Sequence, residues 1–259
     1  RDTDLLLDTR LAPPGSHWAY GLDHFNIKAR IADPSELPPA KDRRLAYAMW
    51  RAFGRDPKFL REKGLGYQER IAKAPDGSYL HGYFQSEHYF ADMLDQMEDE
   101  LRIITPPDVE NAEYADRIAT AGHTVSLHMR RGDYLGTPNA NATYATCDEA
   151  YYLRALARLS QGAGDLKVFV FSDDPGWVRD NLRLPYDMTA VGHNGPDKHY
   201  EDLRLMSCCT DHVIANSTFS WWGGWLDRRP DARVVGPAKW FNDPKLANPD
   251  ILPDRWIAV

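Results

Sequence analysis

The sequence predicts an α/β fold whose second half is a doubly wound domain around a parallel sheet. Residues 167–172, KVFVFS, form a nearly unbroken apolar run, which is typical of a strand buried on both faces of such a sheet. From residue 124 to residue 236, strand-like and helix-like segments alternate. Residues 124–134, TVSLHMRRGDY, alternate apolar and polar side chains at a period of two before a turn-capable Arg-Gly-Asp triplet, which indicates a strand with a polar end.

The composition is that of an ordinary globular protein. Its 259 residues are 43% hydrophobic and 27% charged, a length that suits two domains. A net charge of −7 argues against a general nucleic-acid binder, which needs a basic surface. The chain has no run of about 20 apolar residues and no leader-like start, so neither a membrane span nor a signal peptide is expected. Cys147, Cys208 and Cys209 do not form a disulfide framework and favour a reducing, cytoplasmic location.

The first part of the chain gives a weaker pattern. We expect a strand at 5–7, a helix at 46–53, a basic connector at 58–67, an aromatic segment at 79–90 and a helix within 91–103. The rings of the aromatic segment, YLHGYFQSEHYF, favour a packed core over a ligand platform, although polar groups interleave them. Residues 105–121 have the composition of a linker, so the predicted domains are 1–121 and 122–259.

In the second part of the chain, predicted strands and helices alternate regularly. After the strand at 124, we expect strands at 167–172, 188–191, 212–215 and 233–236, and helices at 148–161, from 175, at 200–209 and at 219–226. In a parallel sheet, ligands bind in the crevice beyond the carboxyl ends of the strands. Three of these strand ends carry polar side chains.

The first strand end holds His128 and Arg130 on one face, with Arg131 starting on the opposite face and Asp133 following. Two guanidinium groups suit a diphosphate, which arginine grips bidentately. A structural ion pair between one arginine and Asp133 is the alternative. An adhesion role for the Arg-Gly-Asp triplet is disfavoured, because that triplet is common by chance.

The second strand end is Ser172-Asp173-Asp174-Pro175. Pro175 suits the first position of a helix and Asp174 its N-cap, which leaves the carboxylate of Asp173 to accept two N–H donors from the edge of a guanine. Capping by both aspartates is the alternative. A metal site has little support, because no His or second carboxylate cluster joins them.

The third strand end is 215–226, ANSTFSWWGGWL, where Asn216, Ser217 and Thr218 lead into a helix. Hydroxyl groups and backbone N–H groups at a helix N-terminus make an anion site. Simple capping by Ser217 is the alternative. Trp221 and Trp225 lie one turn apart and are expected in the core.

These motifs together resemble those of α-1,2-fucosyltransferases, inverting enzymes that use GDP-fucose. HMRRGDY, FSDDP and ANSTFSWWGGWL occur in the family's order and spacing, and GLDHFNI and YLHGYFQSEHYF resemble the segments ahead of them. The resemblance implies a GT-B-like architecture, in which two Rossmann-like domains face each other across a cleft and the second binds the donor. Family members start with a Gly-rich strand and helix, and nothing similar precedes RDTDLLLD, so the N-terminal domain is expected to be incomplete.

The resemblance also implies roles for residues of this chain. The implied donor-binding residues are His128, Arg130, Arg131, Asp173, Asp174, Asn216, Ser217, Thr218, Phe219 and Ser220. We expect Arg130 and Asp133 to be catalytic, Asp133 because it lies beside the arginine pair. We expect Asp23, Gln85 and Glu87 to lie on the acceptor side. As general base, Asp133, Asp8, Asp23, His24 and Glu87 all stay open.

The expected partners are GDP-fucose and a galactose-containing glycan, with neither a metal nor another cofactor. A non-catalytic protein that keeps the same sugar or nucleotide site is the alternative. The expected location is the cytoplasm, or the Golgi lumen if a membrane anchor precedes Arg1.

Overall fold

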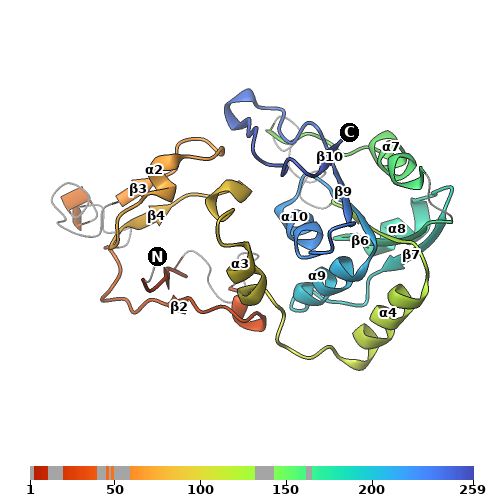
Figure 1. The fold of residues 1–259 in the computed structure, drawn as a ribbon, viewed down its shortest axis with the longest axis horizontal. Coiled ribbons are helices and arrows are strands. Elements are labelled where there is room, and N and C mark those ends of the chain that lie inside the picture. The colour runs from red at the N-terminus through yellow and green to blue at the C-terminus, as the bar shows by residue number, and fades with distance from the viewer. Residues whose placement is uncertain are drawn as a thin grey trace. The chain divides into compact units, whose positions relative to one another are not determined.

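The computed structural model describes residues 3–10, 20–39, 45–46, 48–49, 59–131, 143–161 and 165–259 (Figure 1). The chain divides into two compact units, Arg1–Ile104 and Thr105–Val259. This division differs from the boundary predicted after residue 121. The linker prediction is wrong over α4, Val109–Thr120, because this helix packs Ile118 into the core of the second unit.

The second unit is a six-stranded parallel sheet with helices on both faces (Figure 1). Its strands are β5 Thr124–Met129, β6 Lys167–Ser172, β7 Asp187–Val191, β8 Asp211–Val213, β9 Arg233–Gly236 and β10 Ile257–Ala258. Its helices are α4, α7 Glu149–Ser160, α8 Pro175–Asn181, α9 His199–Cys208, α10 Thr218–Trp225 and the 3₁₀ turn η3 Pro244–Leu246. The predicted strands and helices of this half are confirmed within one or two residues, whereas β10 was missed.

The strand order in this sheet is β10-β9-β8-β5-β6-β7. Counted from β5, this is the order 3-2-1-4-5-6 of a Rossmann sheet. Successive strands therefore run outward from β5 on one side and from β8 on the other, and β5 pairs with β8 through Val125↔Asp211 and Leu127↔Val213. The β5–β8 boundary is the topological switch point, where such folds place their ligand.

Two apolar clusters cover the two faces of this sheet. One joins β5 through Leu127 and Met129 to α7 and α8, and includes Leu156 and Val178. The other joins β6 through Phe171 to α4 and α9. Since both faces are covered, the central residues of β6 are buried, as its apolar run predicts. All six residues of β5 are buried as well, although the sequence predicted a polar face for this strand.

Helix α10 packs closely at the switch point. A Cβ on Gly223 would lie 2.6 Å from Met206 Cε of α9, and a Cβ on Gly224 would lie 3.1 Å from Val234 of β9. The core prediction for Trp221 and Trp225 is confirmed, since they are 7% and 1% exposed. The two glycines therefore let this helix sit close to its neighbours.

In its described residues, the first unit contains only short helices and strands. Its strands are β1 Leu6–Leu7, β2 Arg30–Ile31, β3 Phe59–Arg61 and β4 Tyr79–His81, and they pair in parallel as β1-β2 and β3-β4. Its helices are η1 Leu22–His24, α2 Glu69–Ala72, η2 Glu87–Tyr89 and α3 Leu94–Glu100. The helix predicted at 46–53 lies mostly outside the described residues, and the predicted connector at 58–67 contains β3.

These described elements do not form one Rossmann-like sheet, so that part of the architecture predicted for the N-terminal domain is not observed. Two or three residues per strand pair with a single neighbour each. The observed architecture is therefore an α/β fold with parallel sheets, and among the described residues the Rossmann order is found in the second unit.

A fully buried polar chain joins β5 to β8 beneath the switch point. Ser126 Oγ lies 2.8 Å from His212 Nδ1, and His212 Nε2 lies 2.8 Å from Asp227 Oδ2. The side chains of His212 and Asp227 are 0% and 2% exposed. No substrate can reach these atoms, so this Ser-His-Asp arrangement is structural.

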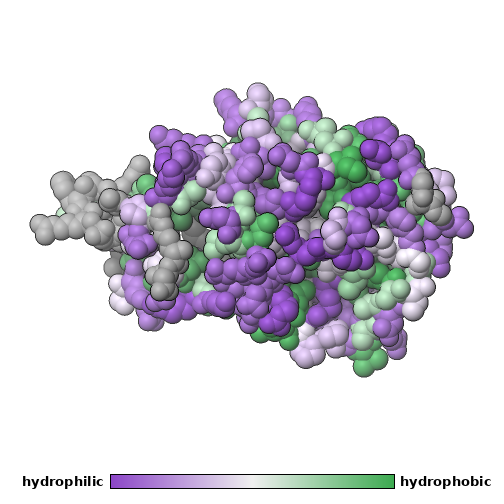
Figure 2. Space-filling view, in the orientation of Figure 1, coloured by the Kyte–Doolittle hydropathy of each residue, from purple (hydrophilic) through white to green (hydrophobic). Residues whose placement is uncertain are grey.

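The visible face of the protein is mostly hydrophilic, with apolar residues in small scattered groups (Figure 2). Across the ranges that the structure describes, no helix combines the length and the apolar character needed to cross a bilayer.

We expect Asp227→Ala to lower the free energy of unfolding by about 3 kcal/mol near neutral pH, because it leaves His212 buried without its partner. Urea denaturation followed by circular dichroism measures this change. Asp231→Ala, which removes an exposed carboxylate nearby, is the control and should stay within about 0.5 kcal/mol.

The same pair predicts a pH dependence. Burial alone raises the pKa of Asp227, but hydrogen bonds from Arg229 and His212 outweigh it and hold that pKa at about 2. A carboxyl group with a depressed pKa stabilises the fold above its unfolded pKa and loses this effect as pH falls through the folded value. The stability difference between Asp227→Ala and the parent should therefore shrink as pH falls from about 4 towards 2, and a constant difference over that range would contradict the assignment.

Candidate functional site at the switch point

The three polar segments predicted from the sequence follow three adjacent strands. They lie at the carboxyl ends of β8, β5 and β6, which are neighbours in the sheet. The predicted convergence of the three segments on one sheet edge is therefore confirmed.

Arg130 follows β5 and reaches towards α10. Its Nη1 donates to Ser217 Oγ at 3.3 Å, so the end of β5 is tied to the start of the helix that follows β8. Ser217 occupies the N-cap position of α10, but its side chain caps no N–H group there. Simple capping, the alternative considered for this serine, is not what the structure shows.

The start of α10 keeps the character of an anion site. The N–H groups in the first turn of a helix have no acceptor within the helix, and here these groups belong to Thr218, Phe219 and Ser220. The hydroxyl of Ser220 is used internally, because it donates to the carbonyl groups of Ala215 and Ser217 at 3.3 and 3.1 Å. The positive ends of peptide dipoles and the guanidinium of Arg130 therefore lie on the same side of the sheet edge.

Arg131 points to the opposite side of the sheet. Its guanidinium carbon lies 3.3 Å from the centroid of the Trp177 ring on α8. Its backbone N–H donates to Asp173 Oδ1 at 2.8 Å. The two arginines diverge, as strand alternation predicts, and Arg131 fixes the end of β5 against β6 and α8.

The two aspartates after β6 have different roles. Asp174 Oδ1 accepts the N–H of Trp177 at 3.0 Å and caps α8, as the sequence predicts. Asp173 Oδ1 accepts the backbone N–H of Arg131. The sequence led us to expect that both oxygens of this carboxylate would accept hydrogen bonds from a ligand, so one of them already has a partner within the protein.

His128 is a buried, neutral imidazole on the Arg130 side of β5. Burial lowers its pKa to about 4; Asp173 opposes this shift, and Arg130 adds to it. Its ring centroid lies 5.6 Å from that of Phe219. Within the described part of the chain, its Nδ1 is buried without a hydrogen-bond partner, which costs free energy unless a ligand or water supplies one.

Asn216 organises the loops around the site. Its Nδ2 donates to the carbonyl oxygens of Ala145 and Trp240 at 2.6 and 3.1 Å, and the Cys147 thiol lies 3.5 Å from its Oδ1. These contacts hold two distant segments next to the end of β8. The structure thus gives its side chain internal partners rather than an open position.

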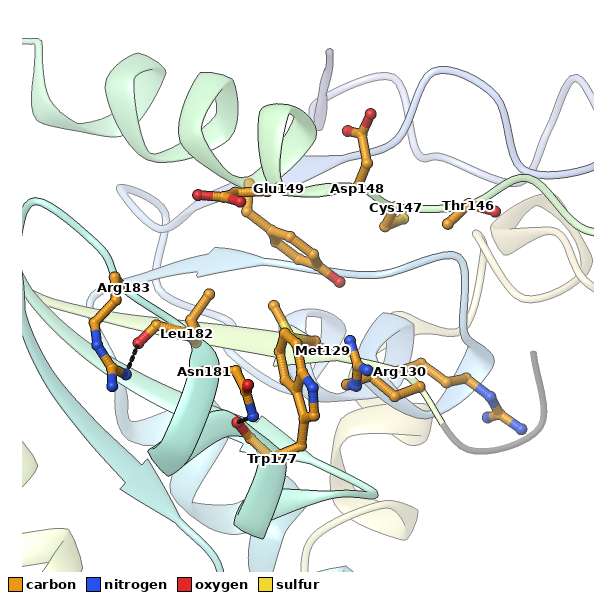
Figure 3. A pocket seen from close by; sticks show the side chains of 12 residues that line it. Met129, Arg130, Thr146, Cys147, Asp148, Glu149, Trp177, Asn181, Leu182 and Arg183 are labelled. Carbon is orange, nitrogen blue, oxygen red and sulfur yellow. Dashed lines mark hydrogen bonds between the residues drawn. The ribbon is translucent and has the colours of Figure 1, made fainter. Parts of the chain in front are cut away.

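A pocket of about 210 Å³ lies on the Arg131 side of β5 (Figure 3). Trp177 and Asn181 of α8 border it below, and Asp148 and Glu149 at the start of α7 border it above (Figure 3). Met129, Tyr152 and Leu182 add apolar surface. The pocket also contacts Arg130, so it adjoins the switch point.

The predicted acceptor-side residues belong to the first unit. Asp23 is exposed in η1, whereas Gln85 and Glu87 are half-buried in the segment after β4. Asp133, the predicted catalytic carboxylate, lies outside the described residues. Sequence reasoning missed Trp177, for which the only signal was an aromatic residue two positions after the predicted Pro175 helix start.

A Rossmann-ordered sheet that presents a helix N-terminus and an arginine at its switch point is the arrangement typical of nucleotide-binding proteins. The model of Glycosyl transferase family 11 matches residues 66–259. This chain belongs to that family, the α-1,2-fucosyltransferase family.

Relatives support the same membership. The chain is 31% identical over 199 residues to an α-1,2-colitosyltransferase of Escherichia coli, with 74% of this chain and 67% of that protein covered. It is 36% identical over 147 residues to the O-antigen biosynthesis glycosyltransferase WbnK of Escherichia coli, with 56% of this chain and 47% of WbnK covered. It is 28% identical to human galactoside α-(1,2)-fucosyltransferase 1 over 39% of this chain and 28% of that enzyme. The chain thus spans about two thirds or less of the length of these relatives.

A crystal structure of the fucosyltransferase NodZ from Bradyrhizobium aligns with this chain, and the alignment covers 70% of this chain and 86% of the NodZ chain. The TM-score is 0.30 and the identity 12%, a likeness too weak to bear on the fold.

We expect His128 to make stability pH-dependent. Its pKa is about 4 in the folded protein against 6.5 in the unfolded chain, so the unfolded state binds more protons between these values. The contribution of His128 to stability is then full above about pH 6.5 and falls by up to about 3 kcal/mol as pH drops towards 4. In a pH series of urea denaturation curves, the stability difference between the parent and His128→Gln should fall by this amount over that range.

His88→Gln, at an exposed position in η2, is the matched control and should keep the parent profile. If the His128→Gln profile also follows the parent, His128 is not a buried neutral imidazole.

Proposed function

We propose that this protein transfers L-fucose from GDP-fucose to the 2-hydroxyl of a galactosyl acceptor with inversion at the sugar. The observation that carries the proposal is Arg130, tied to Ser217 at the N-terminus of α10 on the switch point of a Rossmann sheet. Family membership supplies the class of reaction, and this geometry supplies a position for the charged leaving group.

The diphosphate of the donor would lie at the start of α10. The first-turn N–H groups of Thr218, Phe219 and Ser220 would donate to one phosphate, and Arg130 would pair with the same charge. Ser217 would keep its contact with Arg130 and hold the guanidinium in place, so that little reorganisation is needed when the donor binds.

The nucleoside would lie towards β5 and β6. His128 is neutral, and its Nδ1, which has no hydrogen-bond partner among the described residues, suits a hydrogen bond to the ribose or guanine. Asp173 is an acceptor-only carboxylate at the adjacent strand end. Arg131, Asp174 and Asn216 would act through the positions of these groups, since their described contacts are within the protein.

Among the proposed site residues, Arg130 is expected to contribute most to the reaction rate. As the bond from sugar to phosphate breaks, the sugar gains positive charge and the diphosphate gains negative charge. Pairing with Arg130 strengthens at this stage, so it stabilises the transition state more than the bound donor. The acceptor hydroxyl attacks from the opposite face of the sugar, and we assign Asp133 as the base that takes its proton.

The two units would divide the substrates between them. In the GT-B architecture that we propose, the second unit supplies the donor contacts, and the first supplies acceptor contacts that include Asp23, Gln85 and Glu87. The acceptor is a galactose-containing glycan in this proposal, which draws on the names of the galactoside-specific relatives.

Colitosyl transfer is a second candidate. It is favoured by the Escherichia coli relative that covers 74% of this chain and is named an α-1,2-colitosyltransferase. Parallel assays with fucose and colitose donors that carry the same nucleotide separate the two candidates. The sugar that gives the higher kcat/KM identifies the donor.

A non-catalytic protein that binds the same ligands is the competing class. Incubation with GDP-fucose and lactose distinguishes it, because an enzyme releases GDP and forms a fucosylated product in equal amounts. Ligand binding without product would contradict the proposed transferase.

We expect Arg130→Ala to lower kcat about a hundred- to a thousandfold, the effect of losing one preorganised group that stabilises developing charge. Initial rates of GDP release at saturating GDP-fucose and lactose measure it. Arg158→Ala, at an exposed arginine on α7, is the control and should leave kcat unchanged. Near-normal transfer by Arg130→Ala would remove Arg130 from the catalytic site.

A further inference from the structure

One aromatic side chain of the first unit stands apart from its neighbours. Tyr83 follows β4 and is 75% exposed, the largest exposed fraction among the large aromatic residues that the structure describes. The other tyrosines with notable exposure, Tyr67 and Tyr144, are 38% and 37% exposed, and both contact other rings. Single exposed aromatic residues are common, so exposure alone carries no function.

The backbone that presents Tyr83 is held by a buried carboxylate. Glu62, directly after β3, is 8% exposed. Its Oε2 accepts the successive N–H groups of Tyr83 and Phe84 at 2.7 and 3.1 Å, and its Oε1 accepts the hydroxyl of Tyr89 at 3.3 Å. One buried acidic side chain therefore fixes the peptide units on either side of the exposed ring.

The same segment carries an unfavourable backbone conformation. Phe84 has φ of 50°, in the left-handed region that a bulky residue rarely adopts. A Cβ on Gly82 would lie 2.5 Å from Glu62 Cβ, so only glycine fits before Tyr83. Strain of this kind persists where the surroundings fix it, and it is found at ligand sites.

The neighbouring rings are packed, which leaves Tyr83 as the outward-facing one. The Phe84 ring meets the Tyr89 ring edge-on at 5.7 Å, and Tyr89 lies 5.1 Å from Tyr67. The packed rings and Glu62 form a rigid base beside the parallel pair β3-β4. A rigid backbone beneath the ring lowers the entropy cost of ordering this segment when a ligand binds.

We propose that Tyr83 is a stacking platform for a pyranose ring of the acceptor glycan. A galactosyl ring presents a face of C–H groups, which packs on an aromatic ring, and an edge of hydroxyl groups. Polar side chains that follow Tyr83 in the sequence, Gln85, Glu87 and His88, supply groups suited to those hydroxyls. The inference rests on the proposed function for the identity of the sugar, and on the Glu62 arrangement for the site.

Steady-state kinetics of Tyr83→Ala test the proposal. We expect KM for lactose to rise about five- to tenfold, the loss typical of an aromatic contact, while KM for GDP-fucose stays unchanged. Tyr83→Phe keeps the ring and should stay within about twofold of the parent. Leu80→Ala, at an exposed apolar position on β4, is the matched control and should leave both KM values unchanged.

A binding measurement keeps this test separate from the transferase reaction. Saturation-transfer NMR of methyl β-galactoside with the full chain and GDP should show the ring C–H protons in contact with the parent protein, and this signal should disappear in Tyr83→Ala. If the parent makes no fucosylated product but the NMR contact depends on Tyr83, the proposed function fails and the sugar platform stands.

An unchanged lactose KM in Tyr83→Ala, equal rises in both KM values, or no contact between methyl β-galactoside and the parent protein would each overturn the platform.

Discussion

The parallel pairing of β5 with β8 is the constraint on which the rest of the second unit depends. It places the end of β5 next to the start of α10, and it sets the point from which the other strands run outward. Beneath it, Ser126, His212 and Asp227 form a buried polar chain that ties β5 and β8 to the segment after α10. A fully satisfied buried network of this kind fixes one arrangement of the strands.

The two arginines at the end of β5 point to opposite faces of the sheet. The period of two along β5 sends Arg130 towards α10 and Arg131 towards α8. Arg130 then lies at the helix N-terminus, where we propose that the diphosphate binds, while Arg131 stacks on Trp177 and holds the strand end. A Rossmann sheet thus gives adjacent, chemically identical residues different roles.

Much of the second unit was predictable because its signals are local. The apolar run of β6, the Asp174-Pro175 helix start and the alternation along β5 each depend on a few neighbouring residues. Helix α4 was missed because its apolar positions are sparse and Pro106-Pro107 suggested a linker; its place depends on Ile118 packing against β6. The two-residue strand β10 carries too short a pattern to recognise.

The site was predictable to the level of strand ends and no further. Alternation placed His128 and Arg130 on one face, but the bond from Arg130 to Ser217 and the carbonyl partners of Asn216 join segments far apart in the chain. The Glu62 contact beneath Tyr83 is of the same kind, since it spans two strands. Long-range hydrogen bonds of this sort follow from the fold and leave no periodic signal in the sequence.

The central claim is that a diphosphate binds at the N-terminus of α10. Backbone amide NMR of the ¹⁵N-labelled chain during titration with GDP, and separately with guanosine, tests it most directly. The claim predicts that GDP shifts the amide resonances of Thr218, Phe219 and Ser220 strongly and that guanosine does not. Equal shifts with both ligands, or GDP shifts that leave these three amides unmoved, would contradict it.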